Sequence, residues 1–420
     1  MTAEISILNK HAVALAADSA VTIGDGAKIF TSVHKIFCLS DHHPIGLMIY
    51  GGANFLGIPW ETIIGAYRIK IGSRKFGTLR EYGEHFLRFL ATSPGLFPAS
   101  QQNEQYRFLV KSYLYSLLQE IKSACDDLFS KKGKLSQAEI VAITAKIIDS
   151  HYSKWQSAPL IKSVSDAKFR VLRRKFRLYY RQQIKVFLGK LLLSVAQKNK
   201  IAFILASITY RRLFNTQYVS GIVIGGYGEK EYFSSIVDYE IETMLNNILK
   251  YKEDYSPIDH GNDAIIKAFA QKEMVGSFIE GVHPDFEQRS KRELKKITDS
   301  LPNDFTTSLT FGTILQKSKA RKLFEKKVAN LHTAYNQNMQ QYKYRNFISK
   351  IVGIVGVLPK DELAMMAESL VNLTSFKRRI SMDAETVGGP IDVAIISKNE
   401  GFVWIKRKSY YKQEINIKKI

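Results

Sequence analysis

The first residue along the chain that could do chemistry is Thr2, which directly follows the initiator methionine. A residue this small allows removal of Met1, which would leave a threonine with a free α-amine of ordinary pKa, about 7.7–8.0. Such an amine is a suitable general base at neutral pH, and it could take the proton of the threonine's own hydroxyl, directly or through water. Thr2 is therefore a candidate nucleophile for acyl transfer.

Three further residues could serve such a nucleophile. Asp18 follows an apolar run, and a hairpin of this length returns it beside Thr2. Lys35, placed between them, would stabilise the alkoxide and depress the pKa of the hydroxyl, while Asp18 orients its ammonium. Gly51 allows close approach of backbone to substrate, and an N–H there could stabilise an oxyanion. Taken singly, these residues are typical of ordinary turns and solvated side chains, so their combination carries the hypothesis.

Strands must hold these residues together. The runs 4–8 and 12–17 flank a short turn, and the second is apolar enough to be buried on both faces, which predicts a hairpin in the centre of a sheet. A second pair is expected at 33–39 and 45–50, ending at two glycines. A helical pattern follows at 60–67.

The rest of the chain alternates between helical and strand patterns. Strand patterns return in three later runs: 221–228, 390–397 and 401–406. Long helical patterns dominate 73–215 and 286–358, and the basic tail after Lys406 is expected to fray. This order excludes a simple doubly wound βαβ repeat, and a sheet sandwich covered by helices fits better.

The first sixty residues resemble the opening of proteasome β subunits and of bacterial HslV. The runs that carry the resemblance are TAEISILNKHAVALAADSAVTIG, TSVHKIF and LMIYGGAN. They are similar to the family's nucleophilic Thr, (V/I)AAD(S/T), V-K-K-(V/I) and A-G-G-A. The resemblance implies that Thr2 is the nucleophile, with Asp18 at the family's spacing and Gly51 as the oxyanion-hole glycine. Lys35 takes the family lysine's place after one extra loop residue, and His34 replaces the lysine before it.

A second, weaker resemblance lies near the C-terminus. MDAETVGG at 382–389, followed by Pro, Ile and then Asp-Val, resembles the proteasomal R-D-A-x-S-G-G-x-V turn, whose Asp and Ser support the N-terminal threonine. Asp383 matches that aspartate, and Thr386 stands in for the serine with one residue inserted before the glycines. An ordinary turn before a strand would look the same. The family's Gly-Ser-Gly has no counterpart, since the chain reads KAFAQK at 267–272, which leaves a degenerate or retuned site open.

The resemblance implies an α+β fold, a four-layer αββα Ntn-hydrolase (N-terminal nucleophile) sandwich of two mainly antiparallel sheets with two large helical insertions. The implied parts are a discontinuous core (1–60 with 216–285 and 359–408), a basic helical insertion (61–215), a second helical insertion (286–358) and a basic tail (409–420). The implied activity is that of a threonine peptidase that cleaves peptide amides through an acyl-enzyme on Thr2, with no metal or organic cofactor.

The family resemblance also suggests partners and a substrate pocket. Relatives assemble into rings, so a homo-oligomer is expected, and any unfolding ATPase would be a separate protein because the chain has no P-loop motif. Four residues fall where such enzymes shape the pocket and indicate an apolar substrate side chain: Val21, Val33, Ile49 and Ala53.

Composition limits the location and the partners. Two cysteines without metal or disulfide spacing, no secretory signal and no uninterrupted apolar span predict a soluble protein of the reducing cytoplasm. The net charge is +22, and residues 167–227 contain thirteen Lys and Arg and no acidic residue. The segment 168–212 is either a solvated helix face or a dock for nucleic acid, anionic lipid or an acidic partner.

Two other function classes stay open. One is a proteasome-fold scaffold that has lost catalysis and holds nucleic acid or a partner through its basic helices. The other is an Ntn amidase acting on a small molecule, with the helical insertions closing the cleft against proteins.

Overall fold

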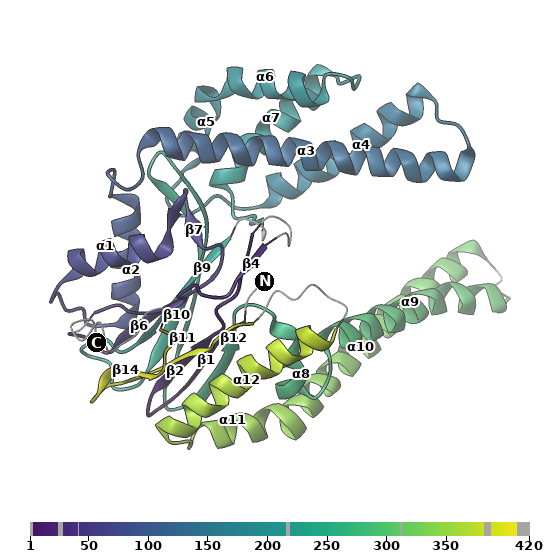
Figure 1. The fold of residues 1–420 in the computed structure, drawn as a ribbon. Coiled ribbons are helices and arrows are strands. Elements are labelled where there is room, and N and C mark those ends of the chain that lie inside the picture. The colour runs from purple at the N-terminus through teal and green to yellow at the C-terminus, as the bar shows by residue number, and fades with distance from the viewer. Residues whose placement is uncertain are drawn as a thin grey trace.

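The computed structural model describes residues 3–23, 28–40, 42–215, 219–310, 313–381 and 388–409. These residues form an α+β protein whose described strands build two five-stranded antiparallel sheets and two short two-stranded ribbons (Figure 1). Long helices project from the sheets in two separate arms, one formed by α3 to α7 and the other by α9 and α10.

The first sheet contains the predicted N-terminal hairpin at its centre. Its strands, in spatial order, are β12 (Ala264–Ala268), β1 (Glu4–Asn9), β2 (Val13–Ala17), β13 (Asp392–Ser397) and β14 (Gly401–Lys406). Every residue of β2 is buried, as its continuous apolar run predicts. The register pairs Glu4 with Ala17, so the end of β2 lies beside the start of β1.

The second sheet is built around the strand that ends at Gly51. Its order is β11 (Ile248–Pro257), β10 (Ser235–Leu245), β9 (Ser220–Gly226), β6 (Ile45–Gly51) and β5 (Ile36–Cys38). Strands β5 and β6 pair as predicted, but β5 is shorter than the expected run 33–39. Val33 leaves the ladder, since its N–H bonds to the carbonyl of Ser19 at 3.3 Å. The ribbons are β3 (Val21–Ile23) with β4 (Lys28–Phe30) and β7 (Asn54–Phe55) with β8 (Ile58–Pro59).

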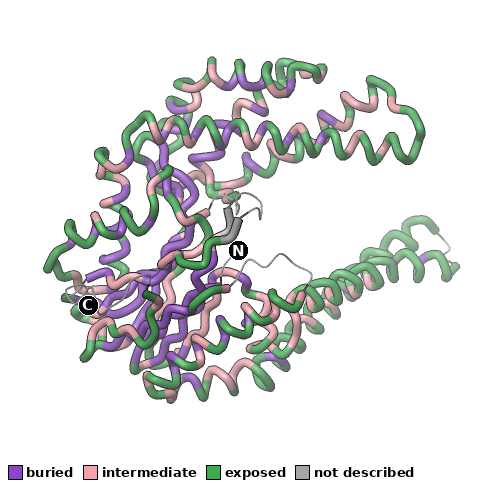
Figure 2. Tube along the Cα trace, viewed as in Figure 1, coloured by how far each residue is buried: buried purple, intermediate pink, exposed green. Residues whose placement is uncertain are grey.

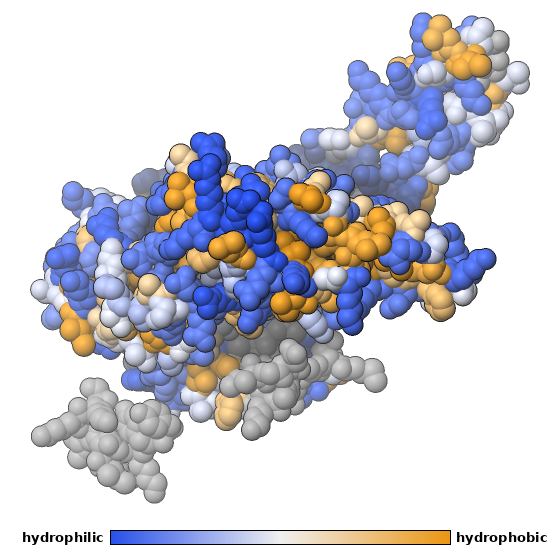
Figure 3. Space-filling view, turned by 90° about the horizontal axis from the view of Figure 1, so that it is seen from above, coloured by the Kyte–Doolittle hydropathy of each residue, from blue (hydrophilic) through white to orange (hydrophobic). Residues whose placement is uncertain are grey.

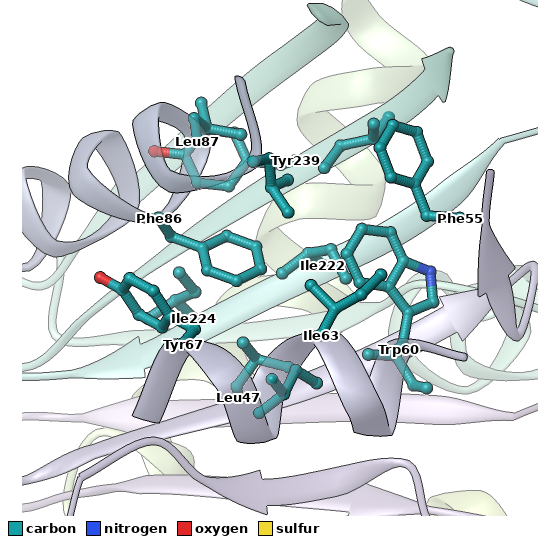
Figure 4. Close-up of a cluster of buried hydrophobic side chains, with 14 of the residues drawn as sticks. Leu47, Phe55, Trp60, Ile63, Tyr67, Phe86, Leu87, Ile222, Ile224 and Tyr239 are labelled. Atoms are coloured by element: carbon teal, nitrogen blue, oxygen red, sulfur yellow. The ribbon is translucent and has the colours of Figure 1, made fainter. Parts of the chain in front are cut away.

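Two helices, α1 (Trp60–Ile71) and α2 (Leu79–Ala91), pack on the second sheet. Their shared core is rich in aromatic side chains, and Tyr67 and Phe86 meet edge to face with centroids 4.9 Å apart (Figure 4). Thr78 and Glu81 form a capping box at the start of α2, which explains where that helix begins.

Helix α12 (Lys360–Ile380) packs on the first sheet. Its Leu363, Ala367 and Val371 share a buried cluster with Ala14 and Ala16 of β2. Small side chains on this face of β2 let a helix approach closely.

The opposite face of β2 meets the second sheet. Val13 and Leu15 share a buried cluster with Val223 of β9 and Ile236 of β10. A Cβ added to Gly225 of β9 would lie 3.2 Å from Val13, so the two sheets are in direct contact here.

The first arm contains most of the basic segment 168–212. Its helices are α3 (Ala99–Lys132), α4 (Gln137–Ser157), α5 (Asp166–Lys175), α6 (Arg177–Leu188) and α7 (Val195–Tyr210). They share a hydrophobic cluster that also includes Leu245 and Ile248 of the second sheet, and in it the hydroxyls of Tyr106 and Tyr180 lie 2.6 Å apart.

The second arm is a long helical hairpin of α9 (Pro284–Ser308) and α10 (Ile314–Lys343), largely exposed along its length (Figure 2). It is joined to the body through α8 (Lys272–Glu280), a π-helical turn (Tyr344–Ile348) and α11 (Ser349–Val355). Within the described ranges, no helix is both long enough and apolar enough to cross a bilayer.

Candidate active site

Asp18 lies at the start of the chain, as the hairpin geometry predicts. The Ala3 N–H donates to Asp18 Oδ1 at 3.0 Å, and the Asp18 N–H donates to the Ala3 carbonyl at 3.1 Å. Asp18 is therefore bonded to the residue that follows Thr2. Thr2 itself lies outside the described residues.

Lys35 reaches the same place from the segment before β5. Its Nζ lies 2.5 Å from Asp18 Oδ1 and 3.0 Å from Glu4 Oε1, and all three side chains are buried. A buried ammonium between two carboxylates has its charge compensated on both sides, which offsets the cost of its desolvation. The structure therefore brings Asp18 and Lys35 together.

Glu4 is the member of this cluster that sequence reasoning missed. It occupies a β1 position that faces the second sheet, where its neighbours along the strand, Ser6 and Leu8, are also buried. The available signal was a single charged residue in a strand that is otherwise uncharged, because a buried acid needs a cationic partner.

The other oxygen of Asp18 binds the C-terminal block. Asp18 Oδ2 accepts from the N–H of Gly388 at 3.0 Å and from that of Ala20 at 3.3 Å. The Ser19 N–H donates to the Gly388 carbonyl at 3.3 Å. Asp383 and Thr386, predicted to support the nucleophile, lie outside the described residues, although the chain that resumes at Gly388 touches Asp18.

The expectation that the tail frays directly after Lys406 is wrong for Lys408. Its Nζ donates to Ser19 Oγ and to the Val33 carbonyl, each at 2.7 Å, and to Asp392 Oδ2 at 2.8 Å. The backbone N–H of Lys408 also donates to Asp392 Oδ1 at 2.8 Å. The pairing of Lys408 with the buried Asp392 holds this part of the tail in place. Periodicity in the sequence gives no sign of such a contact between distant segments.

Asp392 also explains the position of His34, whose Nδ1 lies 3.9 Å from Asp392 Oδ2. Burial opposes ionisation of Asp392, but hydrogen bonds from His34 and Lys408 outweigh it and lower the pKa of this carboxyl. A second buried charge cluster therefore lies beside the Asp18 cluster, joined to it through Ser19.

Gly51 lies on the strand next to Lys35, because the Ile49 N–H donates to the Lys35 carbonyl at 2.8 Å. At about 3.3 Å per strand residue, Gly51 is roughly 7 Å further along from Ile49. Its φ is +71°, and an added Cβ would lie 2.6 Å from the Val219 carbonyl oxygen, so this position requires glycine.

The four predicted pocket residues divide into two pairs. Val33 and Ile49 lie near Lys35. Val33 precedes it by two residues in the chain, and the Ile49 N–H donates to the Lys35 carbonyl. Val21 pairs with Phe30 in the small ribbon, and the Ala53 carbonyl accepts from the N–H of Trp60 at 3.1 Å. Neither of these two is bonded to the charged cluster among the described residues.

Tyr50, between Ile49 and Gly51, binds another buried acid, Asp238. Its hydroxyl lies 3.0 and 3.1 Å from the two carboxylate oxygens of Asp238. Burial raises the pKa of Asp238 to about 6, although the hydrogen bond from Tyr50 lowers it. Asp238 is thus a described carboxyl near the site whose ionisation changes close to neutral pH.

The Asp238→Asn protein is expected to lose a pH dependence of stability. The pKa of Asp238 rises from 3.8 to about 6 on folding, so the folded state holds this proton more tightly than the unfolded state does. The resulting contribution to stability is fully present below pH 3.8 and is lost as pH rises through about 6. The amide carries no charge, so we expect this variant to be about 1–3 kcal/mol more stable than the parent at pH 7.5, and the difference to vanish near pH 4. Urea unfolding at both pH values measures this. Asp299→Asn, on an exposed part of α9, is the control, and an equal difference at both pH values would contradict the expected linkage.

The arrangement can do acid–base and electrostatic chemistry. Among the residues that the structure describes, no three His, Cys, Asp or Glu side chains come together as a metal site. A buried ammonium held by two carboxylates, next to the chain's first residues, can stabilise an anion that forms there.

No protein-family model matches the chain, and no curated protein matches it.

Proposed function

We propose that this chain is a threonine-type Ntn hydrolase that cleaves peptide amide bonds through an acyl-enzyme on Thr2. The single observation that carries the proposal is the buried Lys35–Asp18 pair, bonded to the N–H of Ala3. These are the two residues that the N-terminal pattern selected as partners of Thr2, although they are seventeen positions apart in the sequence.

In this proposal the Thr2 α-amine, free after removal of Met1, takes the hydroxyl proton as Oγ attacks the substrate carbonyl. The tetrahedral oxyanion accepts from the N–H of Gly51, and the C–N bond breaks as the amine's proton passes to the leaving nitrogen. Water, activated by the same amine, then cleaves the ester. Lys35 stabilises the alkoxide, and Asp18 with Asp383 holds the array.

Packing supports the finer architecture that this function implies. Helices α1 and α2 share a core with the second sheet, α12 shares one with the first, and a third cluster contains residues of both sheets. We infer from these contacts a four-layer αββα Ntn-hydrolase sandwich. The Asp18 cluster would then lie between its sheets, at one end.

A second candidate is a scaffold of the same fold that has lost catalysis and binds a partner or nucleic acid. It is favoured by the missing Gly-Ser-Gly and by the thirteen cations in 167–227. Assembly as a homo-oligomer and use of a separate ATPase belong to the first proposal. A small-molecule amidase would differ from both in the size of the substrates that it cleaves.

Mass spectrometry tests the leading proposal. The purified protein is expected to lack one methionine, and an electrophile that reacts with both the hydroxyl and the amine of an N-terminal threonine should add once, on the peptide that begins at Thr2. The same treatment of Thr2→Ala is the matched control and should leave that peptide unmodified. Retention of Met1, or an unmodified N-terminal peptide in the parent protein, rejects the proposal.

A further inference from the structure

A cavity of about 940 Å³ lies in the basic arm, among helices α5, α6 and α7. Seven cationic side chains line it: Arg170, Arg173, Arg174, Arg177, Arg181, Lys185 and Lys198. No acidic residue lines this cavity. Its volume is at the upper end of the range of small-molecule sites in proteins, about 300–1,000 Å³.

The charge of this cavity is not balanced within the described chain. None of the seven cations has a carboxylate within 4.0 Å among the described residues, and 167–227 contains no acid. Of the six other cations in 167–227, Lys200 has a carboxylate partner among the described residues, since its Nζ lies 2.6 Å from Asp149 Oδ1. Concentrating like charges on three short helices is unfavourable, so an anionic occupant would stabilise this region.

Beneath the cations, the cavity has an aliphatic floor. Ile184 and Leu188 are almost fully buried, and Leu191 and Leu193 are half-buried. Val195 also lines the cavity and is 75% exposed. Figure 3 shows the face of this arm, where hydrophobic and hydrophilic side chains lie side by side.

The lining offers little to a stacked base. Tyr180 is the aromatic residue in it, and this side chain is 1% exposed with its hydroxyl bonded to Tyr106. Proteins that hold single-stranded nucleic acid present exposed aromatic faces to the bases. The observed combination of guanidiniums over an aliphatic floor therefore favours a small amphiphilic anion over a nucleic-acid strand.

We propose that this cavity binds a small ester of linked phosphates, with the phosphates on the arginines and the uncharged part on the aliphatic floor. Five guanidiniums suit phosphate because their planar forks bind its oxygens in pairs. A diphosphate or triphosphate also concentrates several negative charges in a few ångströms, whereas carboxylates of a peptide are spread along a chain. The inference is independent of Thr2 and of the proposed hydrolase.

Calorimetric titration of the full chain at about 0.15 M salt tests this inference. Two esters represent the two sources of the shared chemistry: geranyl diphosphate for a hydrocarbon ester and ATP for a nucleotide. Inorganic tripolyphosphate supplies the phosphates without an apolar part. We expect at least one ester to bind more tightly than tripolyphosphate, because only an ester uses the floor.

Matched charge variants locate the binding. Arg177→Ala with Arg181→Ala removes two lining cations and is expected to weaken the tighter ester about 100-fold, at roughly tenfold for each charged contact. Lys168→Ala with Lys190→Ala removes the same charge outside the lining and should weaken binding less than about threefold. Val195→Asp, at an exposed lining position, should weaken binding while leaving the fold intact.

Several results would overturn the inference. The inference fails if neither ester binds or if the two double variants weaken binding equally. It also fails if tripolyphosphate binds as tightly as both esters. Binding confined to an RNA oligonucleotide or to anionic vesicles would likewise reject a small-molecule site and assign the arm to that polymer or surface. Thr2→Ala should bind the ester normally, so a failed hydrolase assay and a failed binding assay remain distinct.

Discussion

Thr2→Ala is expected to reduce turnover of peptide substrates by at least about 10³-fold, because alanine removes the nucleophile and leaves only substrate binding and oxyanion stabilisation. Alanine is as compatible with removal of Met1 as threonine is, so both proteins should begin at position 2. The measurement is the initial rate of hydrolysis of a set of fluorogenic peptides, with thermal unfolding to confirm equal stability.

Thr2→Ser is the matched control for this prediction. Serine keeps both the hydroxyl and the α-amine, so it should retain a substantial fraction of the parental rate. Full activity in the alanine protein would show that another residue carries the reaction. Equal loss in the serine and alanine proteins would show that a hydroxyl at this position is not sufficient.

Lys35→Met is expected to destabilise the fold by about 3–5 kcal/mol, the usual cost of removing one partner from a buried ionic cluster. Lys35 is 2% exposed, and its loss would leave the carboxylates of Glu4 and Asp18 buried without their shared cation. Methionine has a similar length and is apolar, so the change tests the charge more than the packing. Urea unfolding at pH 7.5 gives the free energy of unfolding.

Neutralising the carboxylates should reverse most of that loss. The triple variant Lys35→Met, Glu4→Gln, Asp18→Asn is expected to recover at least about half of the lost stability, since no charge then remains buried in this cluster and the amide oxygen introduced by Asp18→Asn can still accept from the N–H of Ala3. Glu4→Gln alone leaves the Lys35–Asp18 pair intact and should cost about 1 kcal/mol or less. A Lys35→Met protein as stable as its parent would mean that the cluster is solvated or rearranged.

The sequence predicted much of the first sheet because its strands carry strong local signals. The run 12–17 is apolar at every position, and the short turn before it predicts a hairpin. Both strands and their antiparallel pairing are confirmed. The hairpin then places Asp18 near the start of the chain by geometry alone.

The hairpin of β10 and β11 was missed, although its signals are present. Charged and apolar residues alternate through much of 235–257, and Asn246 and Asn247 form a two-residue loop with φ of +52° and +58°. Asparagine tolerates these angles, so the pair is a turn signal of the same kind as Asn-Gly. The alternating polar residues hid the strands because they lower the mean hydropathy of the run.

Helices α1 and α2 show a different limit. From the sequence we expected 61–215 to form one helical insertion. In the structure, Trp60, Tyr67 and Phe86 pack on the second sheet, and the hydrophobic cluster of the first arm starts near Tyr106. Periodicity shows that a helix has an apolar face but does not show what that face contacts.

Residue types near the N-terminus by themselves determined the central hairpin and the placement of Asp18 against the start of the chain, because short-range pairing and a local turn position both. The choice of Lys35 as the partner of Asp18 came instead from the resemblance of the N-terminal pattern to a known family. Only the tertiary structure decided that Glu4 shares that lysine and that Lys408 closes onto Ser19 and Asp392. Both contacts join segments through burial, and the free energy of pairing buried charges depends on neighbours that no local pattern specifies.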